Sequence, residues 1–150
     1  MTYYESPLGW LVISSNGTAI TSIGFVNEPG EQQQADEVTQ KAISQLSEFF
    51  EGTRTHFELP LAPEGTEFEQ RVWDQLLAIP YGTTVTYGHI SKKLGDANLM
   101  RAVGRANGKN PISIVVPCHR VIGSDNKLIG YSGGLKNKEW LLRHEGALLI

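Results

Sequence analysis

The chain has 150 residues, with 13 Lys or Arg, 16 Asp or Glu and one cysteine, and its net charge is −3. This length accommodates one domain or two small ones with a buried core. A single cysteine excludes an internal disulfide and a cysteine-based zinc cluster. Because no apolar run approaches the roughly 20 residues of a membrane span and the first residues lack a secretory signal, we expect a cytoplasmic protein without membrane association.

Charge is divided unevenly along the chain. Before Thr83, three Lys or Arg residues stand against twelve acids, a net charge of −9; from Thr83 onward, ten stand against four, a net charge of +6. The basic half can face phosphates while the acidic half keeps the chain soluble. On charge alone, however, two solvated surfaces are the simpler interpretation.

The amino-terminal part has the pattern of an antiparallel sheet covered by a helix. Strands are expected over residues 3–15 and 19–25, separated by the hairpin signal Asn16-Gly17. Apolar residues then recur at helical spacing over residues 38–50 and stop at a glycine, which predicts an amphipathic helix. Residues 55–59 are a candidate for a further short strand.

A linker over residues 60–65 separates this part from a mainly helical one. We therefore expect an amino-terminal α/β domain over residues 1–62 and a carboxy-terminal domain over residues 63–150. The second domain begins with a capping box, in which Thr66 is followed by Glu69 and an apolar stripe.

Two short helices are expected next, over residues 87–94 and 97–107, with Gly95 between them. Such a pair is typical of helix-turn-helix motifs. The second helix should present a basic face with small neighbours, made of Arg101, Ala102, Gly104 and Arg105. A face of this kind can approach a duplex closely, and one inserted arginine suits the minor groove.

The only cysteine follows a short β-branched run. Residues 112–116 are expected to form a buried strand, and Pro117 fixes the direction in which the chain leaves it. Cys118 comes next, beside His119 and Arg120, and a thiol near an imidazole and a guanidinium has a depressed pKa. These residues make Cys118 a candidate nucleophile; a buried, unreactive cysteine is the alternative.

Downstream of the cysteine we expect a turn over residues 123–127 and a glycine-rich loop over residues 130–134. The glycines of this loop permit close backbone approach to a flat ligand. The last helix is expected over residues 135–143, with Leu135 and Leu142 packed inward.

Six motifs follow one another downstream of residue 65: Thr86-Tyr87, Arg101-Ala-Val-Gly104, Asn110-Pro111, Pro117-Cys-His-Arg120, Gly130-Tyr-Ser-Gly-Gly-Leu135 and Lys138-Glu-Trp-Leu-Leu-Arg-His-Glu-Gly146. This ordered set resembles the O6-alkylguanine-DNA alkyltransferases, also called methylated-DNA–protein-cysteine methyltransferases. The resemblance implies an α+β fold, with a ribonuclease H-like amino-terminal domain of small antiparallel sheet and covering helix. It also implies a mainly helical carboxy-terminal domain with a helix-turn-helix.

The reaction implied by this resemblance is DNA repair in a single turnover. The protein would flip an O6-alkylated guanine out of the duplex and transfer the alkyl group to Cys118. His119 would act as general base, Glu145 would orient the imidazole, and Tyr87 would donate to the leaving guanine. The implied partner is double-stranded DNA containing O6-alkylguanine, bound through the minor groove by a monomer. No cofactor and no metal are expected.

Further residues are implied to hold the substrate and the site. The residues implied to contact the guanine are Val121, Tyr131, Ser132 and Lys138. Arg101 would fill the space that the flipped base leaves, and Asn110 would brace the cysteine turn through backbone hydrogen bonds. Arg105 stands where family members often carry a small residue.

Two other functions fit the same residues. A non-catalytic lesion sensor or helix-turn-helix regulator would bind DNA without using Cys118. A cysteine hydrolase would use Cys118, His119 and Glu145 on an ester or peptide, with no need for Arg101 or a basic carboxy-terminal half. Related lesion sensors carry tryptophan in place of the cysteine, so Cys118 favours alkyl transfer.

Overall fold

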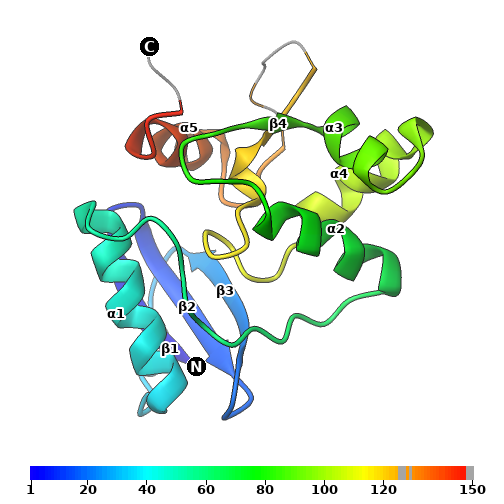
Figure 1. Ribbon diagram of the computed structural model, residues 1–150. Coiled ribbons are helices and arrows are strands. Elements are labelled where there is room, and N and C mark those ends of the chain that lie inside the picture. Colours follow the sequence, from blue (N-terminus) through cyan, green and yellow to red (C-terminus); the bar gives the residue numbers. More distant parts are fainter. Residues whose placement is uncertain (125–127, 129, 148–150) are drawn as a thin grey trace. The chain divides into compact units, whose positions relative to one another are not determined.

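The fold is α+β, as the sequence predicts (Figure 1). The computed structural model describes residues 1–124, 128 and 130–147. It divides into two compact units: unit 1 consists of Met1–Glu64 with Pro111–Val115, and unit 2 of Gly65–Asn110 with Val116–Ile150. Among the described residues, no helix has both the length and the apolar character needed to cross a membrane.

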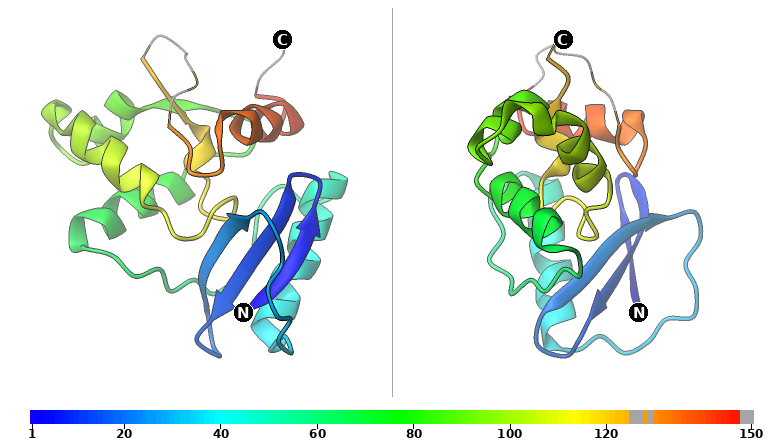
Figure 2. Two further views of the ribbon diagram at one scale, coloured as in Figure 1. Left: turned by 180° about the vertical axis from the view of Figure 1, so that it is seen from behind. Right: turned by 90° about the vertical axis from the view of Figure 1, so that its right-hand side faces the viewer.

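Unit 1 contains an antiparallel sheet of three strands in the order β1-β2-β3 (Figure 2). The strands are β1 (Thr2–Ser6), β2 (Gly9–Ser15) and β3 (Ile20–Val26). The single strand expected over residues 3–15 is therefore wrong, because the chain reverses within it. Ser6 Oγ accepts from the Leu8 N–H at 3.1 Å, and Gly9 adopts a φ of +103°, a left-handed conformation that favours glycine.

Helix α1 (Glu37–Glu51) covers one face of this sheet, as predicted. Asp36 caps its start by accepting from the Thr39 N–H at 2.8 Å, and Gly52 ends it with a φ of +87°. The apolar face that the helix buries consists of Val38, Ala42, Leu46 and Phe49. Together with the inner side chains of the strands, these residues form the core of unit 1.

Residues 55–59 do not form the expected strand. The Gln45 side chain holds this segment instead: its Nε2 donates to the Glu58 carbonyl at 3.1 Å and its Oε1 accepts from the Glu58 N–H at 2.9 Å. Pairing with the sheet is limited to one bridge, between Ile20 and Leu61.

Residues 112–116 do not form the expected strand either. They make a single bridge, in which the Ser113 N–H donates to the Ile23 carbonyl at 3.0 Å. The chain then turns, because Ile114 adopts a φ of +73°, which is strained for a β-branched residue and interrupts the extended backbone. The run is nevertheless buried, as its apolar composition predicts.

Unit 2 consists of short helices around one parallel pair of strands. Its elements in chain order are α2 (Glu67–Leu77), β4 (Val85–Thr86), α3 (Tyr87–Lys93), η1 (Ala97–Leu99), α4 (Met100–Gly108), η2 (Cys118–Arg120), β5 (Val121–Ile122) and α5 (Leu135–His144). The strands β4 and β5 pair in parallel. The expected turn over residues 123–127 lies largely outside the described residues.

Helix α2 begins with the predicted capping box. The Glu69 N–H donates to Thr66 Oγ1 at 3.1 Å, and the Thr66 N–H donates to Glu69 Oε1 at 2.9 Å. Farther along the helix, Trp73 is buried, and its Nε1 donates to the Ala106 carbonyl at 2.9 Å. This hydrogen bond ties α2 to α4, which carries the predicted basic face.

The helix-turn-helix is formed by α3 and α4, but α4 starts three residues later than predicted. Residues 97–99 form the separate 3₁₀ turn η1, because Asp96 Oδ1 accepts from the Asn98 N–H at 2.8 Å and tightens the entry. On α5, the prediction that Leu135 packs inward is wrong, since it is 50% exposed. It is the first helical residue, and the buried face belongs to Lys138, Leu141 and Leu142.

Candidate active site

Cys118 lies on η2, a 3₁₀ helix of one turn, directly after Pro117. The turn is closed by two backbone hydrogen bonds, from the Cys118 N–H to the Val116 carbonyl at 2.8 Å and from the Arg120 N–H to the Pro117 carbonyl at 3.0 Å. A 3₁₀ helix has three residues per turn, so successive side chains point in three different directions. Cys118, His119 and Arg120 therefore have different neighbours although they are consecutive.

Two asparagines contact the backbone around this turn, Asn107 in the last turn of α4 and Asn110 just after the helix. Asn110 Nδ2 donates to the Val116 carbonyl at 2.8 Å. Asn107 Nδ2 lies 3.4 Å from the Cys118 carbonyl, a longer and weaker contact. Sequence reasoning singled out Asn110 but missed Asn107, because nothing in the sequence indicates that α4 ends beside the cysteine.

Cys118 is only 2% exposed. Burial raises its pKa, against smaller lowering effects of a hydrogen bond with Asn110 and the charge of Lys138. The expected depression of the pKa is therefore wrong. Desolvation penalises the thiolate, and the neighbouring guanidinium of Arg120 is directed elsewhere. Attack by this sulfur consequently needs a group that removes the proton.

His119 and Glu145 form a buried pair, with Nε2 and Oε2 2.8 Å apart and both side chains 0% exposed. Burial alone would raise the pKa of Glu145, but hydrogen bonds from His119 and Arg120 outweigh it and lower the pKa to about 2. The carboxylate is thus ionised and accepts only. Burial lowers the pKa of His119, and Arg120 and Lys138 lower it further against the opposing effect of Glu145.

These charges assign the tautomer of the neutral imidazole. Since Glu145 can only accept, Nε2 of His119 carries the proton and Nδ1 keeps a free lone pair. Nδ1 is buried and has no hydrogen-bond partner among the described residues. A buried basic nitrogen left in this way, one residue from the thiol, is suited to take up a proton.

Arg120 forms an ion pair with the same carboxylate. Its Nε donates to Glu145 Oε1 at 2.8 Å, and its Nη2 donates to Oε2 at 3.0 Å. Its Nη1 donates to the Ile79 carbonyl at 2.8 Å, and the guanidinium carbon Cζ lies 5.7 Å from the centre of the Tyr81 ring. Sequence reasoning missed this contact, because adjacency suggested that Arg120 faces the thiol.

Lys138 is fully buried on α5, and its Nζ donates to the Val121 carbonyl at 2.6 Å. Burial lowers the pKa of Lys138 to about 8. The two residues were expected separately as guanine contacts, and the structure joins them to each other. The Val121 carbonyl keeps a second lone pair for another donor.

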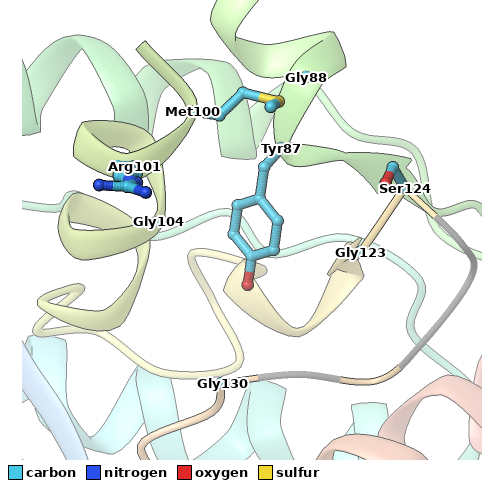
Figure 3. A pocket seen from close by; sticks show the side chains of 8 residues that line it. All are labelled: Tyr87, Gly88, Met100, Arg101, Gly104, Gly123, Ser124 and Gly130. Carbon is cyan, nitrogen blue, oxygen red and sulfur yellow. The ribbon is translucent and has the colours of Figure 1, made fainter. Parts of the chain in front are cut away.

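A pocket of about 360 Å³ opens beside the helix-turn-helix (Figure 3). The residues that line it are Tyr87, Gly88, Met100, Arg101, Gly104, Gly123, Ser124 and Gly130. Tyr87 extends into it from the start of α3, and burial raises the pKa of its hydroxyl. Gly88 and Gly104 have no side chain, which leaves the space open. A Cβ added at Gly88 would lie 3.3 Å from Met100 Sδ, and one added at Gly104 would lie 4.0 Å from Tyr87 Cε1.

The remaining candidates fall into two places. On α4, Arg101 and Arg105 are exposed, and Ala102 and Gly104 are partly buried. In the glycine-rich loop, the Tyr131 ring lies edge-on to His119 with centroids 6.4 Å apart, and Ser132 is exposed. Unit 2 thus combines a helix-turn-helix with a buried cysteine, which is followed in sequence by a histidine that contacts a buried carboxylate.

Similarity to known proteins extends over nearly the whole chain. The family model for the 6-O-methylguanine DNA methyltransferase, ribonuclease-like domain matches residues 1–63, and the model for the DNA binding domain of the same family matches residues 67–147. The methylated-DNA–protein-cysteine methyltransferase of Methanosarcina acetivorans is 43% identical, with 96% of each chain covered. The chain belongs to the 6-O-methylguanine DNA methyltransferase family, which confirms the resemblance drawn from the motifs.

Two solved structures are informative. Mycobacterium tuberculosis OGT in complex with DNA is 41% identical with a TM-score of 0.89, covering 97% of this chain and 92% of that chain. Schizosaccharomyces pombe Atl1 in complex with DNA containing O6-carboxymethylguanine is 34% identical with a TM-score of 0.50, covering 55% of this chain and 79% of that chain.

Proposed function

We infer that this protein repairs DNA by moving an alkyl group, typically methyl, from O6 of guanine to Cys118. The observation that carries this inference is the placement of the buried Cys118 thiol one residue before a neutral His119 whose other nitrogen is held by Glu145. Relatives that align over nearly the whole chain are named methylated-DNA–protein-cysteine methyltransferases.

The reaction starts with removal of the thiol proton. Burial raises the pKa of Cys118, so the thiolate forms only when a base takes the proton. His119 Nδ1 is that base and acts through a water, since consecutive side chains of the 3₁₀ turn point in different directions. The sulfur then attacks the alkyl carbon, the S–C bond forms, and the C–O6 bond breaks. The electron pair of that bond goes to guanine, which takes up one proton at N1 and so balances the one released by the thiol. Tyr87 supplies a hydrogen bond to the leaving base.

Each molecule acts once. A thioether is a poor leaving group, and the sequence holds no second cysteine that could accept the alkyl group. The enzyme is therefore a single-turnover methyltransferase that is consumed by its reaction. Because the reaction needs a reduced thiol, its natural setting is a reducing compartment such as the cytoplasm.

Binding of DNA is assigned to the helix-turn-helix. The exposed Arg101 and Arg105 give α4 a basic face, and its small residues allow close approach to the duplex. We propose that a monomer enters the minor groove, that Arg101 fills the space of the flipped base, and that the guanine enters the pocket beside Tyr87. An alkylated guanine pairs poorly, so it costs less to extrude than an intact one.

The test is the mass of the intact protein after mixing with a duplex that holds one O6-methylguanine. We expect one added methyl group, located on Cys118 by digestion, saturating at one per protein and absent from Cys118→Ser. Lesion-dependent binding without a mass change would instead identify a lesion sensor, the function that the similarity to Atl1 in complex with damaged DNA makes the second candidate.

A further inference from the structure

The ion pair between Arg120 and Glu145 is the contact of the site that the sequence did not predict. Arg120 is 7% exposed, and its guanidinium donates through Nε and Nη2 to the two carboxylate oxygens, at 2.8 and 3.0 Å. Its third nitrogen is fixed by the Ile79 carbonyl at 2.8 Å. A planar fork held at three points has one orientation, and this orientation fixes the plane of the carboxylate.

The carboxylate is therefore shared between two donors. Oε1 is engaged by Arg120, whereas Oε2 accepts from both Arg120 and His119. If Arg120 were absent, Glu145 would face the imidazole alone, free to rotate and with its whole charge available to attract a proton to the pair. The guanidinium thus acts on His119 through the carboxylate, and also directly as a nearby like charge.

The two positively charged groups near His119, Arg120 and Lys138, both disfavour uptake of a further proton. The titratable groups near the His119–Glu145 pair are, besides Arg120, Lys138 from α5, Tyr81 from the segment after α2 and Tyr131 from the glycine-rich loop, and Cys118 precedes His119 in the chain. Lys138 adds a second positive charge near His119, and neither tyrosine is ionised at neutral pH because burial raises both pKa values. Arg120 contacts the carboxylate directly, with Nε 2.8 Å from Oε1.

We propose that Arg120 is a positioning residue that keeps an extra proton off the Glu145–His119 pair, so that Nδ1 of His119 stays available as the base at neutral pH. The proposal rests on the proposed alkyl transfer. It concerns the pair as a unit, because two strongly coupled groups share their protons and an added proton need not belong to one of them. A positive charge beside the pair makes uptake of that proton less favourable wherever it would sit.

The alternative is that Arg120 serves only the packing of unit 2. Removing it would then lower stability, and the rate would fall by the same factor at every pH. A role in protonation predicts something different: the rate should depend on pH in a new way, because the fraction of neutral His119 changes. The pH profile of alkyl transfer therefore separates the two roles.

The experiment measures the single-turnover rate of alkyl transfer from an O6-methylguanine duplex between about pH 5 and about pH 9, a span that brackets histidine ionisation. Arg120→Gln should move the acidic limb to higher pH by roughly one unit, a loss of about tenfold on that limb that disappears at high pH. Arg120→Lys keeps the charge without the fork, so its limb should stay in place while its plateau falls. The matched control is Arg143→Gln, which removes an exposed arginine paired with Glu139 on α5.

A limb that does not move in Arg120→Gln, with all rates scaled equally, would overturn the proposal. A second measurement guards against a variant that does not fold. In wild-type protein labelled with ¹⁵N at histidine, His119 should carry a proton on Nε2 alone at pH 7, and a doubly protonated ring at that pH would also overturn the proposal. The NMR measurement needs no DNA and therefore reports on His119 independently of alkyl transfer. If the wild-type protein failed to transfer the alkyl group, the proposed function would be refuted, but the role of Arg120 would not be decided.

Discussion

Glu145 Oε2 lies 2.8 Å from Nε2 of His119, although the two residues are 26 positions apart and come from a helix end and a 3₁₀ turn. Both side chains are fully buried, and the carboxylate is also held by Arg120. A buried carboxylate gains little from water, so its charge must be met by these two partners. Its position fixes which nitrogen of His119 carries the proton and which keeps a free lone pair.

Replacement of this carboxylate should slow alkyl transfer strongly. Glu145→Gln keeps the shape but removes the charge, and the amide can present a donor to His119 and so favour the wrong tautomer. We expect the single-turnover rate to fall by about 10²-fold or more, measured by mass spectrometry with an O6-methylguanine duplex. Glu139→Gln, on the exposed face of the same helix, is the control and should transfer at the wild-type rate. Equal rates for the two variants would show that Glu145 does not assist the base.

Acidification should destabilise the fold in two stages. Burial lowers the pKa of His119 below 6.5, so the unfolded chain binds the proton first and stability falls as the pH drops below about 6.5. Glu145 has a pKa of about 2 in the folded protein against 4.5 ordinarily, so its contribution is complete above about pH 4.5 and is lost towards pH 2. That second loss amounts to about 3 kcal/mol.

Urea unfolding at a series of pH values measures both stages. Glu145→Gln should lack the loss of stability below about pH 4.5, because the amide does not titrate. A variant whose stability still falls as steeply as that of the wild type in this range would assign the effect to other carboxyl groups.

The brace on the cysteine turn can be tested at Asn110. Asn110→Ala removes the donor to the Val116 carbonyl and leaves that buried oxygen without this partner, which should cost about 1–3 kcal/mol of unfolding free energy. We expect transfer to slow as well, since the turn that aims the thiol loses its support. Asn98→Ala, at an exposed position, is the comparison for the loss of an asparagine side chain. Wild-type stability and rate in Asn110→Ala would rule out this bracing role.

Arg101 should matter for DNA and not for the chemistry. It is exposed, lines the pocket and lies on α4, whereas His119 lies on η2 and Glu145 at the end of α5. Arg101→Ala should therefore lower the rate with an O6-methylguanine duplex by roughly tenfold or more, in keeping with a lost insertion that is worth 1–3 kcal/mol. Transfer from the free O6-methylguanine base should be unchanged; a parallel loss with both substrates would place Arg101 in the reaction itself.

The close approach of Gly65 to Trp73 gives a prediction for stability. A Cβ at this position would lie 2.3 Å from Trp73 Cη2 and 2.9 Å from Glu69 Oε1. Gly65→Ala should destabilise the protein by about 1–3 kcal/mol, because the buried indole cannot move aside without repacking. Thermal unfolding measures the effect, and Gly108→Ala, with open space around its Cβ, is the tolerated counterpart. A Gly65→Ala protein as stable as the wild type would mean that the indole readily shifts.

Local sequence determined much of this protein. The amphipathic helix ending at Gly52, the capping box at Thr66 and the α3–α4 pair follow from spacing and turn residues, which act over a few positions. The motifs around Cys118 sufficed to place the chain in its family. Several strand predictions from local sequence were wrong. A turn at Ser6 and Gly9 divides the first predicted strand into two, and the positive φ of Ile114 interrupts the run that composition alone predicts to be extended.

The chemistry of the site was decided by tertiary structure. The sequence placed Arg120 beside Cys118 and suggested an activated thiol, but the fold directs the guanidinium to Glu145 and buries the thiol, so that its pKa rises. No local pattern could predict this, because the side-chain directions of a 3₁₀ turn and the end of α5 are set by packing between distant segments. The sequence by itself determined which groups are available, and the tertiary structure determined which of them carry the charge, which nitrogen holds the proton and which remains free to accept one.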